Sequence, residues 1–249
     1  KHTSAPAIDK QSDAVSLLTG LQEWDVLFID EIHRLKPIIE ETLYSAMEDY
    51  QIDIILGTWP GATSVRMDLP KFTLIGATTK LSALSNPLRD RFGSVMKLDM
   101  YTDSDLSAIA SRTGGILDAH ISDDVARSIA KRSRGTPRVT NRLVKVIRDY
   151  MTIGEKVSNE KEVQSVFDEL GIDELGLDDM DRKLLRHMRN SFAWGPVGVN
   201  TLASVVGEEE STIEDVIEPY LLKIGLIERT PRWRKLTPKW EEYAKNRLG

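Results

Sequence analysis

The sequence of 249 residues predicts an α/β sheet segment over 1–100, a helical segment over 101–176 and a third segment over 177–249 that ends in a β-hairpin. Three observations predict this organisation. Strand and helix signals alternate in the first segment, which is typical of α/β sheets. Apolar residues recur at helical spacing in the second segment. In the third, three helical stretches precede two short strand-like stretches, which is the winged-helix order.

An apolar run that ends in two carboxylates is the most informative feature of the first segment. Val26–Ile29 lacks polar alternation, which predicts a strand buried on both faces of a parallel sheet, and Asp30 and Glu31 follow it directly. Ligands of such sheets bind outside the carboxyl ends of the strands. Pro37 then suits the first turn of a helix that runs on through Met47.

Two further strand patterns follow this helix. Residues 52–56 and 63–67 flank a stretch that contains Gly and Pro, which predicts a hairpin with a long tip. Residues 72–79 form a second apolar run that ends in Thr78 and Thr79. We expect this run to lie beside the first strand in the same sheet, because the segment alternates strands with helices.

Breaks in the apolar pattern divide the rest of the chain. Helices are predicted over 123–132, 138–150, 181–192, 200–206 and 211–224, and strands over 226–229 and 232–236. We expect Asn200 or Thr201 to cap the helix over 200–206. Ser211 and Glu214 stand in capping-box positions at the start of the next helix, and Gly225 ends it.

Composition excludes several classes of protein. With 41% hydrophobic and 29% charged residues the chain is an ordinary globular protein, and it has no apolar run long enough to cross a bilayer. Zero cysteines exclude disulfides and thiolate metal sites, and fit a reducing cytosol. The net charge of -6 argues against a protein that coats nucleic acid with its whole surface.

The charge is unevenly distributed along the chain. Residues 131–148 include seven Lys or Arg and no acidic residue, and residues 229–249 include seven basic against two acidic residues. Ten acidic residues against two lysines lie between these blocks, over 155–181. Basic blocks in an acidic chain indicate anionic ligands at defined places, although each block alone also fits a solvated helix face.

Side chains at the ends of the two predicted strands suit a nucleotide site. Asp30 and Glu31 can hold a hydrated metal ion and orient a water molecule. The hydroxyl of Thr78 or Thr79 can bond a terminal phosphate or the attacking water. Taken singly, each also fits a structural role, since many buried strands end in an acidic residue and threonine hydroxyls often satisfy backbone groups.

Three arginines can complete such a site. Arg89 and Arg91 are two positions apart and point in different directions on a helix, so one can serve a neighbouring subunit's nucleotide while the other braces its own. An arginine supplied in trans is worth about 10³ to 10⁵ in rate in phosphoryl transfer. Arg138 follows the break at 133–137 and stands at a helix start, where backbone N–H groups attract anions. The structural alternative for Arg89 and Arg91 is a surface ion pair with Asp90 or Asp99, and for Arg138 it is an ordinary exposed arginine.

The order and spacing of these groups are specific. The stretches Leu27–Leu35, Gly76–Thr79, Pro87–Gly93 and Arg132–Arg138 resemble the motif series of the RuvB family of AAA+ ATPases, and Glu218–Leu221 and Arg229–Arg232 extend the resemblance into the third segment. The resemblance covers essentially the whole chain. It implies an AAA+ P-loop-type parallel sheet whose N-terminal part is missing, a helical lid domain and a C-terminal winged-helix domain.

The resemblance also implies a role for each motif residue. Asp30 is expected to act on Mg²⁺, through water, and Glu31 on the attacking water, with Thr79 as sensor 1 and Arg91 as the finger that works in trans. Further nucleotide contacts are expected at Glu48, Asp49, Tyr50, Arg89, Tyr101 (near the adenine) and Arg138 (sensor 2), and DNA contacts at Arg229, Arg232 and Arg234.

The resemblance implies partners as well. A member of this family is expected to be a homo-hexameric motor in the bacterial cytoplasm that uses ATP and Mg²⁺ to drive branch migration of Holliday junctions in recombination and repair. RuvA is expected to dock on the hairpin at 52–67, and RuvC to join in the resolvasome, with no membrane involved. Arg229, Arg232, Arg234 and Lys235 suit sequence-independent contact with phosphates.

The chain departs from the family pattern in two places. The 249 residues contain no G-x-x-x-x-G-K-[ST] phosphate loop, so the chain resembles a family member without its first third. We expect this polypeptide alone neither to bind ATP tightly nor to hydrolyse it. Trp233 stands where the family usually has glycine at the wing tip, which affects the expected turn.

Two other functions remain open from the sequence. Another AAA+ machine, such as a clamp loader, would share the ATPase motifs but lack the winged-helix end. A non-catalytic DNA-binding module would use the winged helix, with the ATPase fold serving only assembly. The sequence at 229–232 argues against the first alternative, and the absent phosphate loop keeps the second open.

Overall fold

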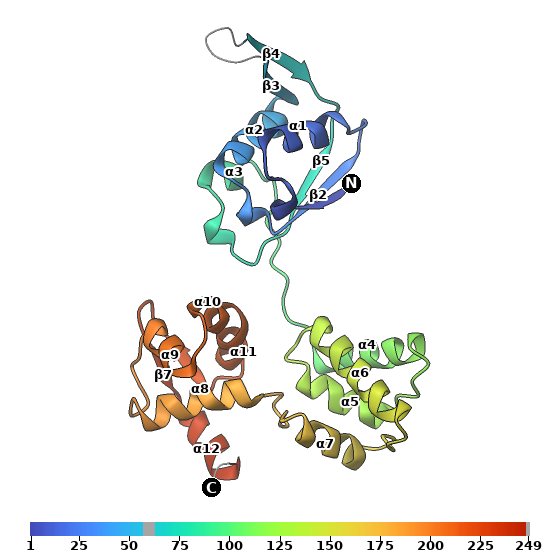
Figure 1. The fold of residues 1–249 in the computed structure, drawn as a ribbon, viewed down its shortest axis with the longest axis vertical. Helices are drawn as coiled ribbons and strands as arrows, with labels where there is room; N and C mark the ends of the chain where they lie inside the picture. Colours follow the sequence, from blue (N-terminus) through green and yellow to red (C-terminus); the bar gives the residue numbers. More distant parts are fainter. Residues whose placement is uncertain (57–62, 248–249) are drawn as a thin grey trace. The chain divides into compact units, whose positions relative to one another are not determined.

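The computed structural model describes residues 1–56 and 63–247. The chain divides into two compact units, 1–97 and 98–249 (Figure 1). The predicted tip of the hairpin, 57–62, lies outside the described residues. Within the described part of the chain, no helix is long and apolar enough to span a bilayer.

The first unit contains a small parallel sheet (Figure 1). Its strands β1 (His2–Ser4), β2 (Val26–Asp30) and β5 (Thr73–Gly76) lie in the order β1-β2-β5, and β2 pairs in parallel with both neighbours. The predicted pairing of the first strand with the second apolar run is therefore confirmed. Ile29 lies opposite Gly76, so the two strands end at the same edge of the sheet.

The helices α1 (Gln11–Thr19) and α2 (Pro37–Glu48) pack against this sheet. Leu27 and Ile29 are each 1% exposed and lie in one core cluster with Leu18 of α1 and Leu43 of α2. Val26, by contrast, is 44% exposed. The prediction that this strand is buried on both faces was wrong, because the described helices cover only the face that carries Leu27 and Ile29.

The predicted hairpin is present beside this core. Its strands β3 (Gln51–Leu56) and β4 (Thr63–Asp68) pair antiparallel, and Asp53 and Arg66 form an ion pair across them with 2.9 Å between Oδ1 and Nε. A short helix, α3 (Asn86–Asp90), follows β5 and is capped by the Ser85 hydroxyl. It buries Leu88 in the same core as the sheet.

The second unit begins with four helices around one apolar core. They are α4 (Asp103–Ile116), α5 (Asp123–Arg132), α6 (Pro137–Thr152) and α7 (Glu160–Glu169). The predicted helices over 123–132 and 138–150 are confirmed. Pro137 stands in the first turn of α6, where the backbone N–H that a proline lacks would have no partner within the helix. Arg134 and Gly135 in the break have positive φ angles of 53° and 78°.

A second core organises the rest of this unit. It is built by α8 (Asp179–Asn190), α9 (Val199–Val206), α10 (Glu210–Thr212), a π-helical segment (Ile213–Ile217), α11 (Glu218–Lys223), β6 (Ile227–Arg229), β7 (Arg234–Leu236) and α12 (Pro238–Arg247). The antiparallel pair β6–β7 gives the predicted winged-helix arrangement. The helix α12, which buries Trp240 completely, was not predicted.

Two predicted helix caps were wrong. Gly198 is the N-cap of α9, and Asn200 lies inside the helix. Glu209 precedes α10, and Glu214 lies in the π-helical segment, where its carboxylate pairs with Arg229 and Arg234 rather than with the backbone. Gly225 follows the third helix with a φ of 72°, as a helix-ending glycine does.

One arginine joins the two cores of the second unit. Arg134, in the break before α6, donates from Nε to the carbonyl of Gly176 at 2.8 Å, and its Nη2 pairs with Asp178 and Asp181. Its guanidinium also lies over the ring of Tyr220, 5.4 Å from the centroid. The backbone is tight here, since a Cβ on Gly176 would lie 2.6 Å from the carbonyl oxygen of Arg132.

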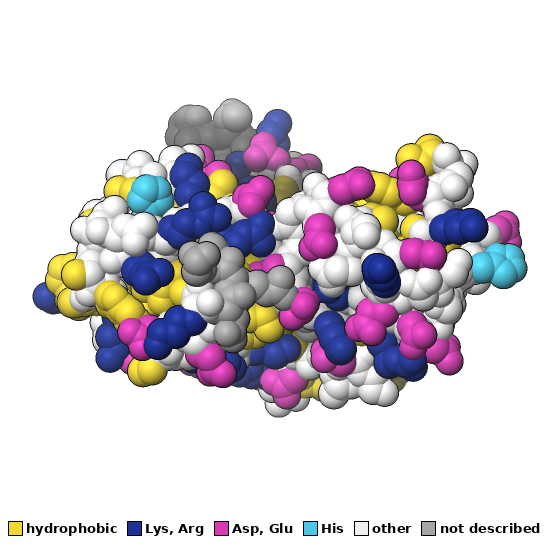
Figure 2. Space-filling view, turned by 90° about the horizontal axis from the view of Figure 1, so that it is seen from below, with side chains coloured by type: hydrophobic (Ala, Val, Ile, Leu, Met, Phe, Trp, Pro, Cys, Tyr) yellow, Lys and Arg dark blue, Asp and Glu magenta, His cyan; other side chains and the backbone are white. Residues whose placement is uncertain are grey.

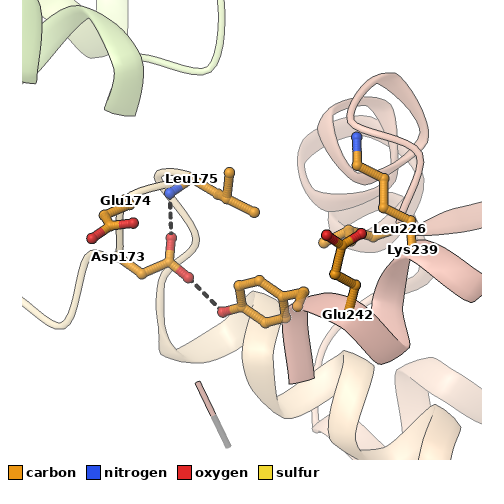
Figure 3. A pocket seen from close by; sticks show the side chains of 7 residues that line it. Asp173, Glu174, Leu175, Leu226, Lys239 and Glu242 are labelled. Atoms are coloured by element: carbon orange, nitrogen blue, oxygen red, sulfur yellow. Dashed lines mark hydrogen bonds between the residues drawn. The ribbon is translucent and has the colours of Figure 1, made fainter. Parts of the chain in front are cut away.

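A shallow pocket of about 260 Å³ lies where α12 meets the segment before α8 (Figure 3). Leu175 and Leu226 line it together with charged residues of both signs. Asp173 holds its rim in place, accepting hydrogen bonds from the Tyr243 hydroxyl and from the backbone N–H of Leu175, the latter at 2.9 Å.

Asp181 is the most strongly perturbed carboxyl group in this joint. Its side chain is 1% exposed, and its Oδ1 has no hydrogen-bond partner among the described residues. Burial raises the pKa of Asp181 from 3.8 to about 6, and the attraction of Arg134 only partly offsets this. Asp178 adds repulsion that acts in the same direction as burial.

We predict that Asp181 makes the free energy of unfolding depend on pH. A raised carboxyl pKa adds stability below pH 3.8, and this stability is lost as the pH rises through about 6. Relative to Asp181→Asn, the wild type should therefore lose on the order of 2 kcal/mol between pH 4 and pH 7. Urea unfolding of both proteins at several pH values measures this, and parallel pH profiles would contradict it.

Candidate nucleotide and DNA sites

The loops that follow β2 and β5 are bound to each other at the edge of the sheet. The N–H of Ala77 donates to the carbonyl of Ile29 at 3.0 Å, and the N–H of Ile32 donates to the carbonyl of Ala77 at 2.9 Å. Gly76 permits this approach, because a Cβ there would lie 2.8 Å from Cδ1 of Ile32. The acidic pair and the two threonines therefore belong to one edge.

Asp30 presents an exposed carboxylate at this edge. Its Oδ1 accepts a hydrogen bond from the backbone N–H of Glu31 at 2.9 Å, which fixes the orientation of the group. No cluster of three or more potential metal ligands occurs among the described residues. One oriented carboxylate fits Mg²⁺, which keeps several waters and takes few protein ligands.

Glu31 lies in a left-handed backbone conformation, with a φ of 51°, that turns its side chain back over the loop. Its Oε2 is 3.4 Å from Nε2 of His33. The other ring nitrogen of His33, Nδ1, is 2.9 Å from the hydroxyl of Thr78. Sequence reasoning missed His33, although its place two residues after the acidic pair was visible.

The two threonines after β5 have different surroundings. Thr78 is partly buried, and its hydroxyl contacts His33 and accepts from the N–H of Lys80 at 2.9 Å. Thr79, the predicted sensor 1, is exposed. Thr79 is thus the one open to a ligand, and Thr78 is engaged within the protein.

Arg89, in α3, and Arg91, directly after this helix, make separate contacts. Arg91 donates to Glu48 at 3.1 and 2.7 Å and to the carbonyl of Pro87 at 2.9 Å, and it lies over the ring of Tyr44 at 4.8 Å. Arg89 donates to Asn86 at 3.1 Å. Arg91 is therefore held by the end of α2 and is 30% exposed.

The other predicted nucleotide contacts next to Glu48 follow α2. Asp49 is the C-cap of this helix, and Tyr50 has a positive φ of 53°. The ring of Tyr50 meets the ring of Phe72 edge-on, with 6.0 Å between the centroids. In the structure these residues connect α2 to the hairpin, a structural role beside the predicted one.

Tyr101 and Arg138 belong to the second unit. The backbone N–H of Tyr101 donates to the carbonyl of Gly135 at 2.9 Å, and its ring is 49% exposed. Arg138 is exposed in the first turn of α6. The break before α6 therefore brings Tyr101 close to the start of the helix that bears Arg138.

The predicted DNA contacts differ in how freely they reach solvent. Arg232 is exposed in the turn between β6 and β7, where Trp233 is 49% exposed. Arg229 is 43% exposed and pairs with Glu214 and Glu218. The backbone around Trp233 is held by a 2.8 Å bond from the N–H of Thr230 to its carbonyl.

Arg234 is buried, unlike its neighbours in the wing. Its side chain is 3% exposed and pairs with Glu218, which is 1% exposed, and with Glu214 at 2.7 Å. Burial opposes the charge of Arg234, but hydrogen bonds and attraction from the two glutamates outweigh it and raise its pKa. A direct phosphate contact by Arg234 would require this network to open.

Charge is finely mixed on the face shown in Figure 2, where acidic and basic side chains lie side by side over much of the surface. This distribution agrees with the net charge of -6. On this face the structure shows no extended surface of one sign of charge.

Comparisons with known proteins agree along the chain. Residues 1–98 match the model of the Holliday junction DNA helicase RuvB P-loop domain, residues 101–173 the RuvB AAA lid domain, and residues 174–245 the RuvB C-terminal winged helix domain.

Solved structures give the same result. The structure described as the Thermotoga maritima RuvB Holliday junction branch migration motor is 44% identical, with a TM-score of 0.85, and the match covers 98% of this chain and 77% of that one. A point mutant of Thermotoga maritima RuvB is 46% identical with a TM-score of 0.85 and the same coverage. The chain therefore belongs to the RuvB family, with an AAA+ α/β sheet, a helical lid and a C-terminal winged-helix domain.

Proposed function

We propose that this protein is a subunit of an ATP-driven DNA motor that moves Holliday junctions in recombination and repair. Its proposed domains are a partial AAA+ domain over 1–100, a lid over 101–176 and a winged-helix domain over 177–249. The observation that supports the proposal is the shared edge of β2 and β5 in a member of the RuvB family, because Asp30 and Glu31 stand at the end of one strand and Thr79 follows the other.

The residues of this edge suit one side of a nucleotide site. Asp30 would hold Mg²⁺ through water, and Thr79 would contact the terminal phosphate. The 249 residues include no G-x-x-x-x-G-K-[ST] loop, so in this proposal they would supply the metal and water side of the site and not the phosphate cradle. When bound, Mg²⁺ neutralises charge on the phosphates.

Glu31 would act as the general base. As a water oxygen forms its bond to the γ-phosphorus, the bond to the bridging oxygen breaks, ADP leaves, and the proton of the water passes to Glu31. A carboxylate that is 39% exposed and free of a Lys or Arg partner among the described residues can take this proton.

Arginines from other elements would complete the site. Arg138 and Tyr101 of the lid would contact the nucleotide, with Arg89, Glu48, Asp49 and Tyr50 near the same site. Arg91 would reach the nucleotide of a neighbouring subunit in a closed hexamer, which requires it to exchange Glu48 for phosphate. The ion pair with Glu48 would neutralise the charge of Arg91 while no neighbouring nucleotide is bound.

The winged helix would hold DNA through phosphates. Arg229 and Arg232 are exposed and would bind the backbone, whereas Arg234 would hold the wing in place through Glu218. RuvA would dock on the hairpin at 52–67, and RuvC would join the assembly at the junction. The proposed site of action is the bacterial cytoplasm.

We predict that Glu31→Gln in the full-length gene product lowers junction-stimulated ATP turnover by about 10² to 10³, because the amide cannot accept the proton. Binding of ATP should persist, since the substitution keeps the shape of the side chain. Phosphate release and nucleotide affinity measure the two effects. Glu41→Gln, at an exposed position of α2, is the control. Turnover at the wild-type rate in Glu31→Gln would contradict the assignment.

We also predict that Arg229→Ala and Arg232→Ala weaken binding to unrelated junction sequences by similar factors, because phosphate contacts carry no sequence information. Each loss should reduce the slope of log affinity against log salt by about 1. Fluorescence anisotropy over a salt series measures this, with Arg112→Ala in the lid as control. A loss confined to one sequence would overturn the prediction.

A further inference from the structure

His33 lies between Glu31 and the loop after β5, which carries Thr78. Its side chain is only 12% exposed, and both of its ring nitrogens face polar groups. Nε2 is 3.4 Å from Oε2 of Glu31, and Nδ1 is 2.9 Å from the hydroxyl oxygen of Thr78. The ring thus connects the loop after β2 with the loop after β5 through side chains, beside the two backbone bonds between them.

The donors and acceptors around His33 define one consistent arrangement for the neutral ring. The N–H of Lys80 donates to the Thr78 hydroxyl oxygen at 2.9 Å, so the hydroxyl proton is free to be donated onward to Nδ1 of His33. A neutral imidazole that accepts at Nδ1 carries its proton on Nε2. That N–H then faces the carboxylate of Glu31, which only accepts.

We propose that His33 is a positioning residue: held by Thr78, it directs its Nε2–H toward Glu31 and so keeps this carboxylate in the orientation that receives a proton from water. The proposal rests on the proposed ATPase function and adds a residue to its site. Glu31 needs such support, because its backbone is left-handed and its side chain is 39% exposed.

The contact of His33 with Thr78 also links the orientation of Glu31 to the position of the loop after β5. Thr78 is the neighbour of Thr79, the residue proposed to contact the terminal phosphate. A shift of the loop after β5 would therefore move Thr78, His33 and Glu31 together, so the base would be aligned only when that loop is in place. In this arrangement Thr78 acts through His33 and does not touch the nucleotide.

Two substitutions of His33 separate its two contacts. His33→Asn keeps a carbonyl oxygen near the position of Nδ1, which can accept from Thr78, but it is too short to reach Glu31. His33→Gln places an amide N–H₂ near the position of Nε2 and can still donate to Glu31. Thr78→Val removes the hydroxyl at nearly constant shape, Thr78→Ser restores it, and His120→Asn changes an exposed histidine of the second unit as the matched control.

The test is steady-state ATP hydrolysis by the full-length gene product with junction DNA. We expect kcat to fall about 10- to 100-fold in His33→Asn and in Thr78→Val, with KM for ATP within about twofold of the wild type, because misplacing a base slows chemistry and not binding. Thr78→Ser should recover most of kcat, and His33→Gln, which keeps the donor to Glu31 without the support of Thr78, should lie between His33→Asn and the wild type. The double variant His33→Asn with Thr78→Val should be no slower than the slower single variant.

Three results would overturn the proposal: an unchanged kcat in His33→Asn, equal loss in His33→Gln and His33→Asn, or multiplicative losses in the double variant. Thermal unfolding of each variant identifies any that fail to fold, and the Thr78 pair tests the relay independently of the ring. Failure of the ATPase function itself looks different, since the wild type would then show no turnover, or Glu31→Gln would be fully active.

Discussion

The parallel pairing of β2 with β5 is the constraint on which the proposed chemistry depends. Ile29 lies opposite Gly76, and the N–H of Ala77 extends the pairing by donating to the carbonyl of Ile29. Because both strands end at the same edge, the carboxylates of Asp30 and Glu31 and the hydroxyls of Thr78 and Thr79 belong to that edge. Shifting this register by one residue would turn the side chains to the opposite face of the sheet.

A comparable joint organises the second unit. The break before α6 places Arg134 against Gly176, Asp178 and Asp181, while the neighbouring Gly135 accepts a hydrogen bond from the backbone of Tyr101. The same short break thus touches a proposed nucleotide contact on one side and the winged-helix domain on the other. Within this contact Arg134 is 15% and Asp181 1% exposed, whereas Asp178 is 47% exposed.

The sequence predicted the parts of the fold that follow from local rules. Apolar runs identified β2 and β5, and the breaks at 133–137 and at Gly225 were correctly placed because proline and glycine act locally. Burial on both faces of β2 was predicted wrongly, since periodicity does not report what covers a face. The helix α12 escaped prediction because it is rich in polar residues and packs into the core through few side chains, among them Trp240, Tyr243 and Ala244.

The sequence motifs identified the candidate site residues, but most contacts of their side chains could not be predicted from the sequence. Charge counts along the chain showed basic and acidic blocks but not that Arg234 is buried against Glu218, which lies 16 residues away. The most direct test of the account is a structure of the full-length protein with Mg²⁺ and a non-hydrolysable ATP analogue. The account predicts Asp30, Glu31, Thr79 and Arg138 of one protomer, and Arg91 of its neighbour, around one triphosphate. A bound nucleotide that Asp30 and Thr79 do not face would contradict it.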